Sequence, residues 1–421
     1  MAPANAENSR ERQGPIARPW RGVPDKDSFF MVINTTRRST QVHKKIIALA
    51  VASMASTTAF AQSNVQVYGI ADVGAAHISP GGADSINKID SGLFRTSRLG
   101  FKGTEDLGNG MKVIFVLEYR LNIDVNQGLG GGFISDAAGV QGSTSGSARE
   151  QYVGLAGDFG TLKGGRMNTT AFKWGIKYVT LGASIFDVTG DNAMWAGSRN
   201  NPLGDIRLSN AVAYHSPTWA GFSLDVNYAR PIEAAATGNG HFDIAQLGLY
   251  YDKGPLSIGA VYDHGKGSGD ATLALGSLAF ARGAGFPPGA TVFPYEDIDF
   301  KSSNLGASYD FGIFKLKATY QSDKFMNQDR NTVWGIGAEI PVFSKGTVHA
   351  VYSAANVKTL DDADSQGLSL AYTHALSKRT IAYAGYTWRG NDNAARSGIW
   401  AVAPAAGGSV KLFAAGLTHM F

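Results

Sequence analysis

The chain has 421 residues, of which 53 are glycine, 17% are charged and none is cysteine. The lack of cysteine excludes disulfide scaffolds, thiolate metal sites, iron–sulfur clusters and thiol nucleophiles. Abundant glycine together with 22 Phe and 16 Tyr favours strands and turns over helices. The net charge of +4 comes from residues 1–61, since the rest of the chain carries 29 basic and 30 acidic residues, and we therefore expect no nucleic-acid partner.

The first segment has the features of an export signal. Lys44 and Lys45 precede a short apolar run, and small residues then continue to an A-x-A sequence that ends at Ala61. The run is shorter than the roughly 20 apolar residues that a membrane-spanning helix needs. We expect residues 31–61 to be a signal peptide that starts at Met31, residues 1–30 to be an N-terminal extension, and residues 62–421 to be the exported domain.

The exported part alternates between apolar and polar residues. Between Met111 and Leu121 the odd positions are apolar, whereas the even positions include Lys112, Glu118 and Arg120. The same period of two recurs at 222–228, at 314–321 and at 334–340. No apolar stretch after Ala61 is long enough for a spanning helix, which leaves a soluble exported protein or an outer-membrane barrel.

The link lengths favour the barrel. Sixteen strands are predicted near 65–75, 94–103, 111–121, 149–156, 161–168, 207–216, 222–230, 243–252, 256–264, 303–310, 313–321, 332–340, 347–356, 367–375, 380–389 and 409–421. Every second link is short, and most of the others are long, such as 122–148 and 265–302. We therefore predict an all-β fold, a 16-stranded antiparallel transmembrane β-barrel with short periplasmic turns and long extracellular loops. Because a barrel of this size encloses an aqueous lumen, transport is the leading function.

Several sequence blocks resemble the Gram-negative outer-membrane general porins. They are Val65–Asp72, Ser97–Gly108, Tyr152–Leu155, Phe159–Leu162, Gly165-Arg166, Ala375–Thr380 and Gly416–Phe421. The resemblance implies passive diffusion of ions and small hydrophilic solutes through a multi-pass homotrimer in the outer membrane. It also implies contact with outer-membrane lipid and lipopolysaccharide, insertion by the outer-membrane assembly machinery, and a terminal Phe421 that serves as the assembly signal.

The resemblance further implies a pore narrowed by an inward-folded third loop, which corresponds here to 168–206. Arginines on the opposite wall would face acids of this loop, and two arginines match by motif, Arg98 and Arg149. The predicted basic wall is Arg98, Arg149 and Arg120, and the predicted loop acids are Asp187 and Asp191. The other predicted lumen-lining residues are Lys112, Glu118, Lys315 and Lys317, for which the plain alternative is that polar side chains simply line water. Arg166 shares its parity with Leu162 and is expected to point outward.

Two other functions fit the sequence less well. A substrate-specific channel would show an aromatic ladder along the lumen, whereas the predicted lumen residues are mixed charges, Gln and small residues. A barrel enzyme such as an outer-membrane phospholipase needs Ser and His together on the lipid-facing surface, and no serine motif accompanies the outward-facing His419. The eight histidines have no HxxxH or HxH spacing, so we expect neither catalysis nor a metal or cofactor. Ion preference is left open.

Overall fold

The computed structural model describes residues 64–125, 148–189, 207–232, 241–268, 297–325, 327, 329–358, 360–400 and 402–421. The predicted N-terminal extension and signal peptide, residues 1–61, lie outside the described residues, as does Asp191. None of the described helices is both long and apolar enough to cross a membrane.

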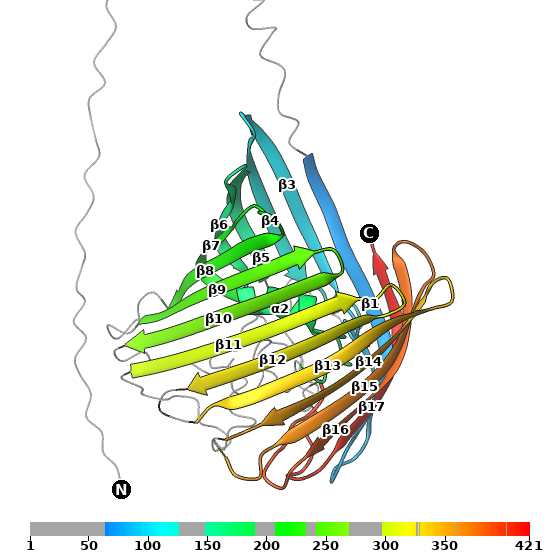
Figure 1. Ribbon diagram of the computed structural model, residues 1–421. Helices are drawn as coiled ribbons and strands as arrows, with labels where there is room; N and C mark the ends of the chain where they lie inside the picture. Colours follow the sequence, from blue (N-terminus) through cyan, green and yellow to red (C-terminus); the bar gives the residue numbers. More distant parts are fainter. Residues whose placement is uncertain are drawn as a thin grey trace, which may run out of the picture. The chain divides into compact units, whose positions relative to one another are not determined.

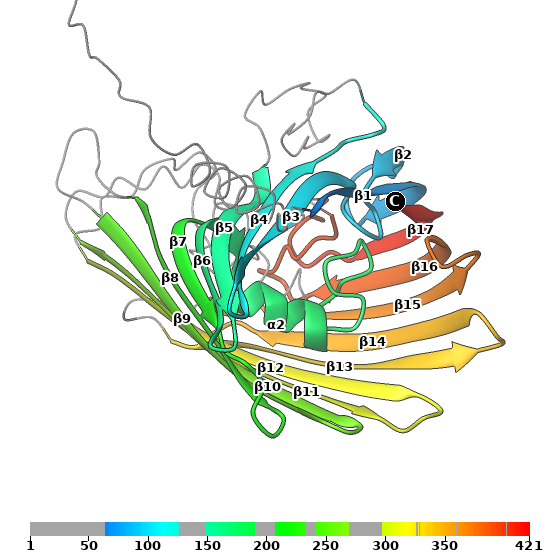
Figure 2. The same cartoon turned by 90° about the horizontal axis from the view of Figure 1, so that it is seen from above.

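The described strands form one antiparallel sheet that closes on itself through pairing of the first and last strands (Figures 1 and 2). The strands are β1 (Asn64–Pro80), β2 (Ile86–Ser91), β3 (Arg98–Gly108), β4 (Met111–Arg120), β5 (Ala148–Gly157), β6 (Gly160–Asn168), β7 (Arg207–His215), β8 (Phe222–Ile232), β9 (His241–Lys253), β10 (Leu256–Ser268), β11 (Asp297–Asp310), β12 (Lys315–Phe325), β13 (Asn331–Val342), β14 (Gly346–Asn356), β15 (Ser365–Ala375), β16 (Thr380–Asn391) and β17 (Val410–Met420). A single described helix, α2 (Thr170–Tyr178), follows β6.

The barrel has sixteen strand positions, as predicted, because β2 and β3 share one of them. Both strands pair with β1: β3 pairs with residues 64–70 and β2 with residues 73–78. The prediction of a continuous strand over 94–103 is wrong at its start. Residues 92–97 leave the sheet, beginning at Gly92, whose φ of +77° is readily available only to glycine.

The predicted alternation is confirmed in the strands. In β17 and the residue after it, Phe413, Leu417 and Phe421 are exposed on the outside, whereas Leu412 and Thr418 are completely buried on the inside. Apolar side chains on the outer face are what a barrel in lipid requires. The predicted short turns are confirmed as well, for example between β3 and β4, where Asn109 and Gly110 both have positive φ, as in the tight turns of hairpins.

The described part of the third loop, residues 169–189, folds inward, and α2 lies within the ring of strands (Figure 2). The helix begins after Thr169, whose hydroxyl accepts a hydrogen bond from the Phe172 N–H and so caps the first turn. Trp174 donates its indole N–H to the Gly259 carbonyl at 3.1 Å, and the Tyr178 hydroxyl lies 2.9 Å from the Ser257 hydroxyl. Both contacts fasten α2 to the inner face of β10.

Small residues make space for this loop on the barrel wall. A Cβ at Gly259 or Gly306 would lie 2.5 Å from a ring atom of Tyr178, a distance that atoms do not adopt. A Cβ added at five other inward-facing glycines would also come within 2.9 Å of this loop: Gly248, Gly335, Gly337, Gly367 and Gly385, opposite Thr170, Thr189, Thr180, Val188 and Phe186 respectively. We call these seven glycines the glycine belt. They allow the loop to pack directly against the wall.

The described part of the third loop is also held at its far end. The Val188 carbonyl accepts hydrogen bonds from Ser353 of β14 and Arg389 of β16, both at 2.8 Å. Ile185 and Phe186, which are almost fully buried, belong to a core cluster with residues of β1, β16 and β17. The loop therefore runs along the β9–β16 wall and reaches the wall opposite its origin.

Candidate functional site

Three arginines gather on adjacent strands, on the stretch of wall formed by β3, β4 and β5. Arg98 is the first residue of β3 and is the register partner of Arg120, the last residue of β4. Arg149 is the second residue of β5, where the β4–β5 register shifts between Leu117 and Tyr119. Such a β-bulge changes the direction of a side chain. We call Arg98, Arg120 and Arg149 the arginine cluster.

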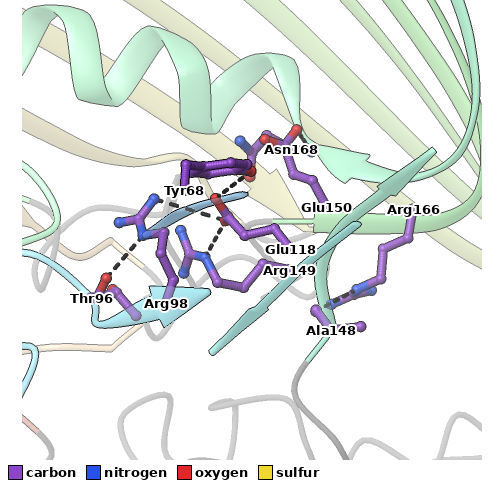
Figure 3. Close-up of polar contacts among 9 residues, drawn as sticks. All are labelled: Tyr68, Thr96, Arg98, Glu118, Ala148, Arg149, Glu150, Arg166 and Asn168. Carbon is purple, nitrogen blue, oxygen red and sulfur yellow. Dashed lines mark hydrogen bonds and ion pairs between the residues drawn. The ribbon is translucent and has the colours of Figure 1, made fainter. Parts of the chain in front are cut away.

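One carboxylate is shared by two of these arginines. Glu118 Oε1 lies 2.5 Å from Arg149 Nε and 3.8 Å from an Arg98 guanidinium nitrogen. Figure 3 shows both guanidinium groups directed toward Glu118. The second carboxylate oxygen accepts a hydrogen bond from the Tyr68 hydroxyl at 3.0 Å. Because Glu118 balances only one of the two guanidinium cations, Arg98, Arg149 and Glu118 together carry an excess positive charge.

The rest of the arginine cluster is positioned by nearby oxygen atoms. Arg98 donates from Nε to the Thr96 carbonyl at 2.9 Å, and Arg120 donates from Nε to the Asn122 side chain at 3.1 Å. Arg120 and Arg149 are each only 7% exposed. A guanidinium remains charged under any ordinary condition, and its fixed fork of donors suits carboxylate and phosphate anions.

Tyr68, which contacts Glu118, was not among the predicted site residues. Its ring lies beneath Lys102, with the ammonium 5.1 Å from the ring centroid, and it occupies the space that a Cβ at Gly100 would need. Val65 and Val67 are 59% and 60% exposed on the outer face. Side chains of a strand alternate between its two faces, so Tyr68, one position after Val67, faces inward. This alternation in the sequence would have identified Tyr68 as an inward-facing residue.

The acid that touches the arginines comes from the wall and not from the described part of the third loop. The Asp187 carboxylate accepts the Ala183 N–H at 2.9 Å and so stabilises the bend of its own loop. Asp191 is outside the described residues. Third-loop acids opposite the arginines thus stay a prediction. Glu118 was expected only as one of several lumen-lining residues, and its even parity with Arg120 was the signal that linked the two.

The predicted lysines lie elsewhere. Lys317 forms an ion pair with Glu339 of β13 at 2.7 Å, and Lys315 lies 3.8 Å from Asp310 of β11. Both lysines are near the short turn at 311–314, close to an end of the barrel. Lys112 is exposed and follows another short turn by two residues. The structure therefore does not bring these three lysines into the arginine cluster.

Arg166 is directed away from the cluster (Figure 3). Its side chain donates to the Ala148 carbonyl at 3.0 Å and to the Ser209 hydroxyl at 2.8 Å. These contacts tie β6 to the beginning of β5 and to β7. A direction away from the arginine cluster agrees with the parity of Arg166 in the sequence.

The chain is similar to known outer-membrane proteins over most of its length. The profile of a family described as Gram-negative porin matches residues 48–394. Outer membrane porin protein 32 of Delftia acidovorans is 31% identical over 377 residues, which cover 87% of this chain and 94% of the relative. The solved anion-selective porin from Comamonas acidovorans superimposes with a TM-score of 0.67 at 27% identity, over 86% of this chain and 100% of that one. A trimer form of OmpT from Vibrio cholerae, at 16% identity and a TM-score of 0.58, shares the fold over 85% of this chain and 99% of its own.

Proposed function

Because the chain belongs to the Gram-negative porin family, we propose that Arg98, Arg149 and Glu118 form the selective constriction of its pore and make that pore prefer anions. The chain is a multi-pass outer-membrane porin of the Gram-negative type, and its barrel is a water-filled channel for passive diffusion of ions and small hydrophilic solutes. The family and these relatives are channels, which favours transport over catalysis. Selectivity among the solutes then depends on the charges that line the passage.

The observation that carries the proposal is that two guanidinium groups share one carboxylate. The third loop packs along the β9–β16 wall and reduces the space across which these charges act. Walls of low dielectric concentrate the field of a fixed charge in a narrow passage, so the excess cation there attracts anions and repels cations. The similar porin from Comamonas acidovorans is itself anion-selective, which supports the same preference here.

Planar-bilayer recording of the refolded chain, residues 62–421, under a gradient of potassium chloride tests this proposal. We expect large ohmic steps and a reversal potential of the sign that chloride permeation produces. A reversal potential of the opposite sign would contradict the assignment of an anion preference. A matched variant, Lys315→Ala, removes a lumen-side cation outside the arginine cluster and should change the reversal potential less than Arg98→Ala does.

We also propose that the protein is a homotrimer. The outer face of β1, β2 and β14–β17 carries a groove of about 960 Å³, lined by small residues such as Ala75 and Ala415 beside the larger Ile89 and Phe413. Ile89 is 71% exposed, an apolar side chain that either a neighbouring barrel or lipid would cover. The existence of a trimer form of OmpT, which shares this fold, supports the neighbouring barrel.

Ala415→Trp would fill this groove. We expect the variant to run as a monomer on gels of unheated samples and to close in single steps in bilayers, whereas the parent closes in threes. A trimer that survives the substitution would assign the groove to lipid.

The terminal residue supports the remaining part of the proposal, assembly into the membrane. Phe421 pairs with Gly69 through both backbone groups, and its ring lies where a Cβ at Gly69 would be. The ring is 46% exposed on the outer face, accessible to the assembly machinery. Phe421→Ala should reduce the amount of barrel that reaches the outer membrane without changing the conductance of the barrels that do. Outer-membrane lipid and lipopolysaccharide complete the proposed partners.

A further inference from the structure

Residues 92–97, which we call the inward step, interrupt the wall between β2 and β3. The chain turns out of the sheet at Gly92, whose N–H donates to the Asp72 carbonyl at 2.9 Å. Leu93 and Ser97, at the two ends of the step, are completely buried. The step therefore is a defined structure that packs into the interior of the barrel.

One carboxylate organises this step. Asp72 of β1 is completely buried, and its oxygens accept four hydrogen bonds. The backbone N–H groups of Phe94 and Arg95 donate at 3.2 and 3.1 Å, and the hydroxyls of Tyr383 and Thr418 supply the other two bonds. All four donors are neutral. A carboxylate offers about four acceptor sites, so Asp72 is fully used and holds the step to β16 and β17 at once.

Ser97 adds a second fastening between the same segments. Its hydroxyl donates to the Asp72 carbonyl at 3.0 Å and accepts the Asp72 backbone N–H at 2.9 Å. The beginning, middle and end of the step are thus all bonded to one residue of β1. Such a network has little freedom, because each buried polar group depends on the others for its partner.

The step in turn holds Ile185 and Phe186 of the third loop, which we call the loop tip. The Leu93 carbonyl accepts the Ile185 N–H at 2.7 Å. The Tyr383 ring stacks on Phe94 with centroids 5.0 Å apart and meets Phe186 edge-on at 6.3 Å, while its hydroxyl donates to Asp72. Tyr383 therefore connects the carboxylate, the step and the loop tip.

The step also leads directly into the arginine cluster. Arg98 follows Ser97, and its Nε donates to the Thr96 carbonyl inside the step. The position of this carbonyl consequently directs the guanidinium that faces Glu118. Arg98 and the loop tip are therefore both bonded to the same six residues.

We propose that Asp72 is a positioning residue of the pore: by holding the inward step it sets the location of both Arg98 and the third-loop tip, and so the selectivity of the passage. This inference rests on the proposed function for the role of Arg98. Asp72 does not itself contact the passing ion, since it is completely buried. Its effect is transmitted through the Thr96 and Leu93 carbonyls.

Cross-linking tests the positioning without reference to ion preference. The chain has no cysteine, so Leu93→Cys with Ile185→Cys introduces a single pair at the point where step and loop tip touch. With copper phenanthroline as the oxidant, we expect rapid disulfide formation in the refolded full barrel. Adding Asp72→Asn should slow it by roughly tenfold, because an amide cannot accept bonds from all four donors and a charge-assisted network is lost. An unchanged rate would overturn the proposal.

The sign of the selectivity change separates positioning from simple charge removal. Loss of a negative charge alone would strengthen an anion preference, whereas a displaced Arg98 weakens it. In the bilayer assay we expect Asp72→Asn to lower the ratio of chloride to potassium permeability by about threefold, since the field of a displaced charge falls with distance. Asp263→Asn, which removes another buried carboxylate from the inner wall of β10, is the matched control and should leave the ratio unchanged or raise it.

Two milder variants cover the case in which Asp72→Asn does not fold. Tyr383→Phe and Thr418→Val each remove one donor and keep the carboxylate. Each should slow the cross-link and lower the permeability ratio in the same directions, by less. If both leave the two measurements at the parent values, Asp72 has no positioning role. If the parent barrel prefers cations, the proposed function fails, and the cross-linking rates still decide whether Asp72 holds the step.

Discussion

The two walls of this barrel use opposite kinds of residue. On β3–β5, long charged side chains project from the sheet and meet at Glu118. On β9–β16, the inner face carries the glycine belt, and the third loop packs directly on it. One wall supplies charge and the other supplies space. We therefore expect substitutions on the first wall to change which ions pass, and substitutions on the second to change how wide the passage is and how stable the loop is.

The largest effect on selectivity should come from removing both arginines that share Glu118. Arg98→Ala with Arg149→Ala leaves Glu118 without the two cations that it contacts, so the excess positive charge is lost. A charge at 4 Å contributes about 1 kcal/mol in water, and the permeability ratio of chloride to potassium should consequently fall by about tenfold or more. Conductance should rise because two bulky side chains are lost. An unchanged reversal potential in a salt gradient would remove both arginines from the constriction.

The second effect concerns the opposite wall. Gly306→Leu places side-chain atoms where Tyr178 lies, and overpacking of this kind costs about 1–3 kcal/mol. We expect α2 to be displaced, with noisier and altered single-channel conductance and a lower melting temperature. The ratio of anion to cation permeability should change less than in the double arginine variant. Gly164→Leu, at a position where no atom lies within 4 Å of an added Cβ, is the matched control. Equal effects of the two variants would argue against the glycine belt.

A smaller and opposite change in selectivity should follow Glu118→Gln. The amide keeps the size of the side chain but leaves both guanidinium groups unbalanced. We expect the preference for chloride to increase by roughly two- to threefold, and more strongly at low salt because mobile ions screen the field. Measurement at two ionic strengths checks this. A decrease in chloride preference would mean that Glu118 serves mainly to hold the arginines in place.

The smallest expected effect is the alkaline response of the loop. The pKa of the Tyr178 hydroxyl is raised to about 12, mainly by burial; the hydrogen bond with Ser257 opposes this shift, and the charge of neighbouring Asp252 contributes to it. Since the folded-state pKa lies above the unfolded value, this contribution to stability is complete below about pH 10 and is lost as the pH rises toward 12. Thermal stability between pH 9 and pH 12 should therefore fall more steeply in the parent than in Tyr178→Phe. Parallel curves would exclude this contribution.

Most of the fold was accessible from the chain itself, because a membrane-facing strand must alternate with a period of two. His419 was predicted on the outer face, and the structure confirms it: His419 is exposed, as are Leu417 and Phe421 of the same parity. The strand expected at 94–103 begins only at Arg98, for a reason that is not local in the sequence. The hydrogen bonds that pull residues 92–97 inward come from Asp72, more than 20 positions away in the chain.

The candidate site divides in the same way. Periodicity, link lengths and the motif around Arg98 were enough to predict a barrel of sixteen strand positions with arginines inside it. Each of these features can be recognised in consecutive residues of the sequence. Only the tertiary structure decided that Glu118 is the acid between Arg98 and Arg149, that Asp187 stabilises its own loop, and that the glycine belt receives α2. These facts depend on which side chains meet across strands and across the lumen, and no spacing along the chain encodes a distance through space.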